Sequence, residues 1–385
     1  MKFERLFVFS LLVPQTHAFL STTIDKGSAV LNSATSAMPD LTFNNPDTTG
    51  IEEQACIDAA QRMRRISVPV STNVSSEGSV GISYVHWPAE RPKKGSPPLI
   101  LIHGFDSSGL EYRRLGPKLA AKGIDAYAVD ILGWGFTQLD NVDSFSANSK
   151  VEALTSFVET VFGKEAKFCI AGASLGGAAA IELAAAKKDD CAGLILIDAQ
   201  GFVDGVGPMA ALPKPLAKIG VGVLRSIPLR NSANQMSYFD KETFATEEAQ
   251  VIGRLHCLRD GWSDAMVSFM QSGGFSPSAK VPTIESPSLV LWGRQDGILD
   301  GEEFANKFVE TLPNAKLQWI EECGHVPHLE QPDETAEAIS LFLSSEASGS
   351  TESEQTLTDT EPMYLVGAGF AGVLALTKIV DLITF

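Results

Sequence analysis

The sequence lacks the paired cysteines that metal and redox sites use. Its five cysteines are widely spaced, and no two of them form a CxxC pair. The pattern therefore predicts neither a zinc site nor a thiol–disulfide motif. Cys169 and Cys191 lie in apolar runs, where a free cysteine packs as a small hydrophobic residue. We expect no metal and no cofactor.

Positive charge is also scarce. The 385 residues include 30 lysines and arginines against 47 acidic residues, which gives a formal net charge of −17. A polyanion repels the phosphate backbone, so we do not expect nucleic acid as a partner. The same charge argues against binding of the soluble body to anionic lipid.

The N-terminal 50 residues lack the pattern of a folded domain. Residues 1–18 begin with a net basic stretch, continue with the apolar run Leu6–Val13, and end in small residues before a cut after Ala18. They predict a signal peptide and entry into the secretory route. Residues 19–50 are rich in Ser and Thr and predict a disordered or transit-like segment. Together they resemble the bipartite plastid presequence of algae, which implies a plastid location.

The C-terminal end also differs from the middle. Residues 344–362 are acidic without a basic residue and predict a solvated linker. Residues 363–385 contain fifteen uncharged residues before Lys378 and predict a membrane helix that tethers the protein. The alternative is an amphipathic tail packed on the body. A G-x-G-x-x-G pattern ends at Gly372, but the chain stops thirteen residues later, too early for a dinucleotide-binding unit.

The middle of the chain alternates short apolar runs with helical patterns. This alternation is typical of a mostly parallel sheet with helices on its faces. The predicted strands are Ile66–Asn73, Val80–Trp87, Pro98–His103, Ala126–Ile131, Lys167–Ala171, Gly193–Ile197, Ser288–Trp292 and Lys316–Ile320. The predicted helices are Ile51–Ile66, Tyr112–Lys122, Ser144–Phe162, Gly177–Lys188, Gly301–Thr311 and Pro332–Leu343.

One gap in the strand series is too long for a loop. Residues 201–285 contain helical patterns, Gly and Pro breaks and many aromatic side chains, but no strand of the core series. An insertion of this size in a compact domain is usually functional. We interpret it as a mobile helical cap on a core formed by residues 51–200 and 286–343. Its apolar composition favours a hydrophobic substrate.

The strongest motif is GASLGG at 172–177, between a predicted strand and an Ala-rich helix. It matches the G-x-S-x-G turn, whose strained geometry exposes a nucleophilic serine, here Ser174. The N–H of Leu175, at the start of the helix, can stabilise a developing oxyanion.

A second motif, HGF at 103–105, follows a predicted strand. Gly104 allows the chain to turn close to the nucleophile, and the N–H of Phe105 is the second predicted donor of the oxyanion hole. We expect His103 itself to be structural.

The acid and the base follow the last two predicted strands. Asp296, in WGRQDG, is the predicted acid that orients an imidazole, with Asp198 and Asp300 as alternatives. His325, in CGHVPHLE, is the predicted general base, with His328 as its alternative. His86 and His256 fall outside this pattern, and we expect them to be structural.

The order Ser174, Asp296, His325 and the motifs HGF, GASLGG, WGRQDG and GHVPHLEQP resemble the α/β-hydrolase superfamily over residues 80–343. The stretches 101–137 and 253–274 resemble plastid hydrolases of plants and algae. The resemblance implies an eight-stranded, mostly parallel α/β-hydrolase sheet with flanking helices and a helical cap inserted after the sixth strand.

A serine nucleophile argues for acyl chemistry, and against the members of this superfamily that attack with aspartate. We therefore expect a serine hydrolase that cleaves an ester or thioester of a small hydrophobic substrate through an acyl-enzyme. An acyltransferase with the same triad is one alternative, and transfer to an added alcohol acceptor would reveal it. A ligand receptor with slow turnover is the other.

Overall fold

The computed structural model describes residues 40 and 42–348. The predicted signal peptide 1–18 and the predicted membrane helix 363–385 lie outside the described residues, as do most of segment 19–50 and of linker 344–362. None of the helices in the described part of the chain is long and apolar enough to span a membrane.

Eight strands of the described chain form one sheet, in the order β1-β2-β4-β3-β5-β6-β7-β8. β2 pairs antiparallel with β1 and β4, and all other neighbours are parallel. The predicted mostly parallel eight-stranded sheet is therefore confirmed. The strands are β1 (Arg64–Pro69), β2 (Ser79–Trp87), β3 (Leu99–Ile102), β4 (Ala126–Val129), β5 (Phe168–Ala173), β6 (Cys191–Ile197), β7 (Ser288–Gly293) and β8 (Ala315–Ile320).

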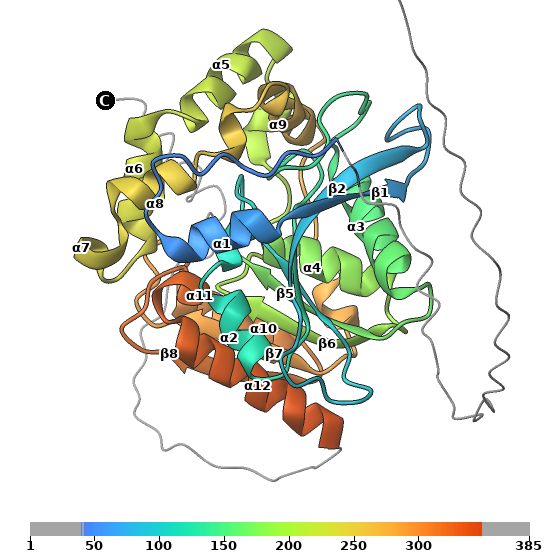
Figure 1. Ribbon diagram of the computed structural model, residues 1–385, viewed down its shortest axis with the longest axis vertical. Coiled ribbons are helices and arrows are strands. Elements are labelled where there is room, and N and C mark those ends of the chain that lie inside the picture. Colours follow the sequence, from blue (N-terminus) through green and yellow to red (C-terminus); the bar gives the residue numbers. More distant parts are fainter. Residues whose placement is uncertain (1–39, 41, 349–385) are drawn as a thin grey trace, which may run out of the picture. The chain divides into compact units, whose positions relative to one another are not determined.

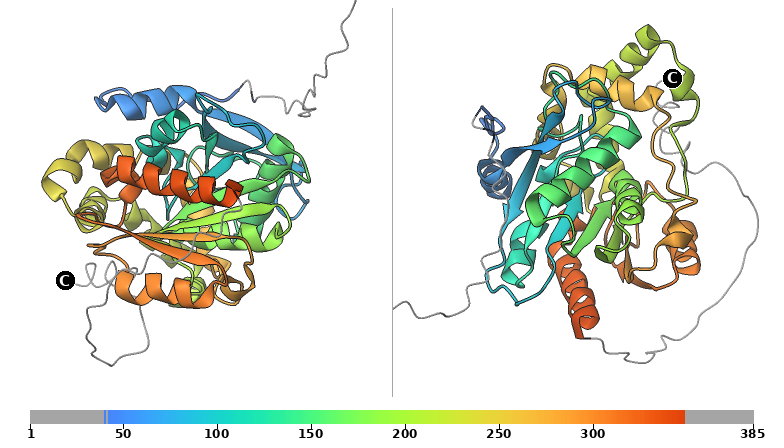
Figure 2. Two further views of the ribbon diagram at one scale, coloured as in Figure 1. Left: turned by 90° about the horizontal axis from the view of Figure 1, so that it is seen from below. Right: turned by 90° about the vertical axis from the view of Figure 1, so that its right-hand side faces the viewer.

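Helices cover both faces of this sheet (Figures 1 and 2). One face carries α1 (Gln54–Arg62), α2 (Leu115–Ala121) and α12 (Pro332–Ser348), and the other carries α3 (Ala147–Phe162), α4 (Leu175–Ala186) and α10 (Gly301–Thr311). Because neither face meets water, the central strands are apolar throughout rather than alternating.

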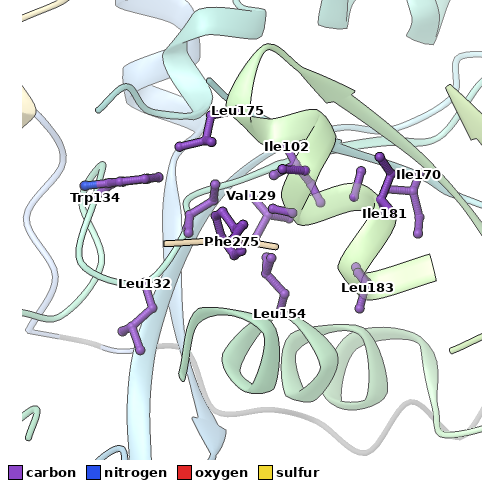
Figure 3. Close-up of a cluster of buried hydrophobic side chains, with 14 of the residues drawn as sticks. Ile102, Val129, Leu132, Trp134, Leu154, Ile170, Leu175, Ile181, Leu183 and Phe275 are labelled. Atoms are coloured by element: carbon purple, nitrogen blue, oxygen red, sulfur yellow. The ribbon is translucent and has the colours of Figure 1, made fainter. Parts of the chain in front are cut away.

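The two faces form two separate cores. In β3, Ile100 and Ile102 pack into the core under α3 and α4, and Leu99 and Leu101 pack into the core under α2 and α12. Figure 3 shows the first core, where Ile102 and Val129 of the sheet lie near helix residues such as Leu154 and Ile181. The carboxyl ends of the parallel strands all lie at the same end of the sheet, and the loops that follow them form the region where ligands bind in such folds.

Two predicted helix boundaries were wrong. The helix predicted over Ile51–Ile66 is shorter, because the chain from Arg64 onward pairs with β2 as an edge strand. The helix predicted to end at Leu343 continues to Ser348, since no Gly or Pro stops it before that residue.

The described chain between β6 and β7 is helical, as expected of the insertion that we call the cap, whose bounds of 201–285 stay a prediction. It comprises α5 (Lys214–Leu224), α6 (Ile227–Ser237), α7 (Lys241–Phe244), α8 (Glu247–Ile252), α9 (Trp262–Gln271) and the short 3-10 turns η2 (Gly207–Ala211), η3 (His256–Leu258) and η4 (Val281–Thr283). α5 packs against α9, and α6 packs against α8. Figure 1 shows α5 at the outer edge of this cap, away from the sheet.

Candidate active site

Ser174 occupies a sharp turn between β5 and α4. Its backbone has φ 51° and ψ −125°, a conformation that non-glycine residues rarely adopt. Glycine is required on both sides of the turn. A Cβ atom on Gly172 would lie 2.3 Å from the carbonyl oxygen of Gly176, and one on Gly176 would lie 2.3 Å from the carbonyl oxygen of Ile102. The G-x-S-x-G spacing therefore follows from sterics.

The loop after β3 approaches this turn closely. A Cβ atom on Gly104 would lie 3.3 Å from the Cβ atom of Ser174. Next to it, the N–H of Phe105 has no acceptor within the described part of the chain. The N–H of Leu175 belongs to the first turn of α4, where the helix itself supplies no partner. Both predicted oxyanion donors therefore lie beside the serine.

His325 and Asp296 lie on the loops after β8 and β7. The Nδ1 atom of His325 is 2.8 Å from Oδ2 of Asp296, and both side chains are almost fully buried. The other carboxylate oxygen of Asp296 accepts the N–H groups of Ile298 at 2.7 Å and Leu299 at 3.1 Å. These bonds fix the carboxylate, which in turn fixes the imidazole and leaves its Nε2 atom for the cavity.

The two alternative acids have other roles. Asp300 is the N-cap of α10 and accepts the N–H of Glu303 at 3.1 Å. Asp198 is completely buried behind the pair, and its Oδ1 accepts the N–H of Gly293 at 3.0 Å. Burial and the neighbouring Asp296 carboxylate raise the pKa of Asp198 well above its usual value. These surroundings favour the protonated form of Asp198.

Ligand atoms of Asp198, Asp296 and His325 lie within 4.8 Å of one another, the spacing of a metal site. However, one oxygen of Asp198 and both oxygens of Asp296 already accept hydrogen bonds, and Nδ1 of His325 faces Asp296. The raised pKa of Asp198 also makes it a poorer cation ligand than an ordinary carboxylate. The arrangement fits a hydrogen-bonded chain better than a metal centre.

Two other histidines near the site, His328 and His103, have partners of their own. The alternative base, His328, faces Glu111, with its Nε2 atom 2.9 Å from Oε1. His103 is buried, with Nδ1 2.9 Å from its neighbour's carbonyl oxygen, and its Nε2 accepts the N–H of Ile131. Burial lowers the pKa of His103, so its ring is neutral and bridges the loops after β3 and β4.

A cavity of about 310 Å³ joins these parts. Ser174, His325, Phe105 and Leu175 all line it, and Asp296 lies behind His325. The structure thus brings the five predicted residues together around one space. The other lining side chains are apolar and polar in about equal number, and the apolar ones come from the body and from α6, α8 and α9 of the cap.

Comparison with known proteins agrees with this geometry. A model of the alpha/beta hydrolase family matches residues 99–338. The chain belongs to this family. With a serine at the turn after β5, it is an α/β-fold serine hydrolase, as the motifs predicted.

This hydrolase is similar to curated proteins from plants and bacteria. It is 34% identical to the alpha/beta hydrolase domain-containing protein VTE7 of Arabidopsis thaliana, over 79% of this chain and 90% of the relative. It is 27% identical to Lipase 1 of Psychrobacter immobilis, over 66% of this chain and 80% of the relative. Among solved structures, an esterase from Thermogutta terrifontis superposes with a TM-score of 0.59 at 20% identity, over 73% of this chain and 98% of the other.

Asp106 of this hydrolase was missed by the sequence analysis. It follows Phe105, and its carboxylate is held by three cap residues: Arg230 of α6, His256 at 2.9 Å and Trp262 at 2.7 Å. Burial raises the pKa of Asp106, but the Arg230 guanidinium and the hydrogen bonds from His256 and Trp262 more than offset it and hold the pKa well below its usual value. The oxyanion loop is thereby bound to the cap.

Glu330 was also missed, although it lies within a motif that the analysis identified. Its buried carboxylate accepts the N–H of Gly324 at 2.7 Å, of Asp240 at 2.7 Å and of Phe239 at 3.2 Å. The N–H of His325 donates to the carbonyl oxygen of Ser237, at the end of α6, at 2.7 Å. The histidine loop is therefore bound to the cap as well. Contacts between residues this distant in sequence leave no local pattern.

Proposed function

We propose that the protein hydrolyses carboxylic esters or thioesters of small hydrophobic substrates, with Ser174 as nucleophile, His325 as general base and Asp296 as orienting acid. The observation that carries the proposal is the 2.8 Å pair of His325 and Asp296, beside a cavity that also contains the strained serine. A buried carboxylate on Nδ1 favours the tautomer whose Nε2 accepts a proton.

The reaction follows from this arrangement. Oγ of Ser174 attacks the ester carbonyl carbon, and its proton passes to Nε2 of His325. The carbonyl oxygen becomes an anion that accepts the N–H groups of Phe105 and Leu175. His325 then gives the proton to the leaving alkoxide, the ester C–O bond breaks, and an acyl-enzyme remains. Water repeats the sequence on the acyl-enzyme, which releases the acid and restores Ser174. Two donors of this kind typically contribute about 3–4 kcal/mol each.

The substrate class is proposed from the walls of the cavity. Leu110, Val206, Ile252, Phe269 and Leu329 present apolar groups to it. An aliphatic or aromatic acyl or alcohol group gains about 0.8 kcal/mol for each methylene that it buries there. The esterase and lipase names among the related proteins support the same class.

A fluorophosphonate probe tests the nucleophile. We expect the wild type to be labelled at Ser174, and Ser174→Ala to be unlabelled and inactive toward a chromogenic ester series. Equal labelling of the two proteins would disprove the assignment. Ser108→Ala is a suitable control, because Ser108 also lines the cavity but does not stand at the strained turn after β5.

We also propose a plastid location reached through the signal peptide 1–18, with a tether formed by residues 363–385. Similarity to a plant protein supports the location in a general way. The test is to determine the N-terminus of the mature protein and to compare membrane fractionation with and without residues 363–385. A mature chain that retains Met1, or unchanged fractionation, would contradict the respective proposal.

A further inference from the structure

The cap carries most of the large hydrophobic side chains that the described residues expose. Of the eight large hydrophobic side chains that these residues expose, seven lie in the cap and only Leu341 lies outside it. Soluble proteins usually scatter such residues singly, whereas a concentration of them marks an interaction surface. Four of the seven, Leu212, Leu216, Ile219 and Ile227, lie on α5 or within three residues of its ends.

α5 presents apolar side chains to solvent as well as to the rest of the cap. Its buried side, Ala217 and Val221, packs against α9. Its solvent side presents Leu216, which is 55% exposed, and Ile219, which is 67% exposed. The outward position of α5 at the edge of the cap is visible in Figures 1 and 2. This apolar face is not covered by any other element of the described chain.

The charge around α5 is opposite to that of the protein. Residues 205–239 contain four basic residues and no acidic residue, in a chain with a net charge of −17. Lys214, Lys218 and Arg225 are exposed on or next to α5, and Lys218 pairs with Asp264 of α9 at 2.6 Å. The fourth, Arg230, points inward to Asp106. Although the whole chain is strongly acidic, the surface around α5 is basic and apolar.

We propose that α5, with Leu212 and Ile227, docks the cap on an anionic lipid surface. Exposed aliphatic side chains bordered by lysine and arginine are what an interfacial helix uses, because the former enter the acyl boundary while the latter meet lipid phosphates. A second copy of the chain fits less well, since a symmetric contact would bring the basic borders of two α5 helices together. α6, which follows after two residues, lines the cavity. Docking therefore places the cavity wall beside the lipid layer.

A local fluorophore in the full-length chain tests this surface. All five native cysteines are buried, so Ile219→Cys can be labelled selectively with an environment-sensitive dye. Leu341→Cys is the matched control, because Leu341 is 63% exposed but lies on α12. We expect a blue shift at position 219 with vesicles that contain phosphatidylglycerol, a smaller one with phosphatidylcholine alone, and none at position 341. A label at α5 reports contact there, whichever other part of the chain meets the vesicle.

A second variant separates docking from catalysis. Leu216→Glu combined with Ile219→Glu should weaken vesicle contact at least about tenfold, since two aliphatic side chains no longer enter the lipid. It should leave hydrolysis of a water-soluble ester unchanged. The proposal is overturned if position 219 gives no shift when vesicles are added. A shift without vesicles that grows with protein concentration would also overturn it, because that result indicates self-association.

Discussion

Three residues beside the cavity adopt left-handed backbone conformations after neighbouring strands. Asp106, Ser174 and Asp198 have φ values of 47°, 51° and 43°. Each such residue costs of order 1–3 kcal/mol, so the surrounding contacts must hold it. In this way the loops turn sharply and direct their side chains into the site. The G-x-S-x-G motif predicted the sharp turn at Ser174, but no sequence motif predicted the turns at Asp106 and Asp198.

The first prediction distinguishes Asp296 from Asp198. Asp296→Asn should lower kcat by about 10³–10⁴-fold, because an amide holds the imidazole in the wrong tautomer. Asp198→Asn should change kcat by less than about threefold, since the raised pKa of Asp198 favours its protonated form, which makes hydrogen bonds similar to those of an amide. Steady-state kinetics on a soluble ester measures both. Asp300→Asn, at a helix cap, is the inert control. The reverse ranking would mean that the acid is Asp198.

The raised pKa of Asp198 predicts a pH dependence of stability. The carboxyl binds its proton more tightly in the folded chain than in the unfolded chain, where the pKa is about 4. Its contribution is therefore fully present below about pH 4 and is lost as pH rises toward the folded pKa, by up to about 1.4 kcal/mol per pH unit. Urea unfolding between about pH 5 and pH 8 should show the wild type losing stability relative to Asp198→Asn. Parallel curves would show that Asp198 is ionised in the folded protein.

At the scale of the elements, α6 links the two loops that carry the site. Arg230 in its second turn holds Asp106 on the oxyanion loop, and Ser237 at its end accepts the N–H of His325. Glu330 completes the link to the segment after α6. The cap thus fixes the spacing between the proposed oxyanion donors and the proposed base, His325, and it also lines the cavity. The predicted mobility of the cap is expected to lie elsewhere, at Gly205 and at 273–274, where its two ends pair.

Glu330→Gln should weaken this link. The amide NH₂ group would face a backbone N–H that the carboxylate now accepts, which costs about 1–3 kcal/mol. We expect a lower free energy of unfolding and, because the loop of His325 loosens, a fall in kcat that exceeds any change in KM. Denaturant unfolding and kinetics on a soluble ester test this. Glu334→Gln, on the exposed side of α12, should change neither the free energy of unfolding nor kcat. A loss of stability with unchanged kcat would limit Glu330 to a structural role.

At the scale of the whole molecule, the features that could be predicted from the sequence are those that a local pattern of residues encodes. Buried parallel strands appear as apolar runs, and the loops at their carboxyl ends carry the motifs, so the sheet and the grouping of the five candidate residues were predictable. The attachment of the cap was not, because Asp106 meets Trp262 across 156 positions and no periodicity records it. Trp262 itself does not line the cavity, whereas Phe269 does. The start of the edge strand β1 was misplaced for a similar reason, since Arg64 and Arg65 pair with β2 although they continue a local helical pattern.

Body and cap share the cavity, and this division predicts how substrate size can be changed. The body supplies Ser174 and His325, and the cap supplies walls such as Ala233 of α6. Ala233→Trp should fill part of the space without touching the reacting groups. We expect short-chain esters to keep their kcat/KM and longer chains to lose about fourfold for each methylene that no longer fits, or about 0.8 kcal/mol. A chain-length panel of chromogenic esters measures this, with Ala211→Trp on the exposed turn η2 as control. An equal loss of kcat/KM at every chain length would place the acyl group outside this cavity. A cavity made smaller by the tryptophan can select against longer chains only if those chains bind inside it.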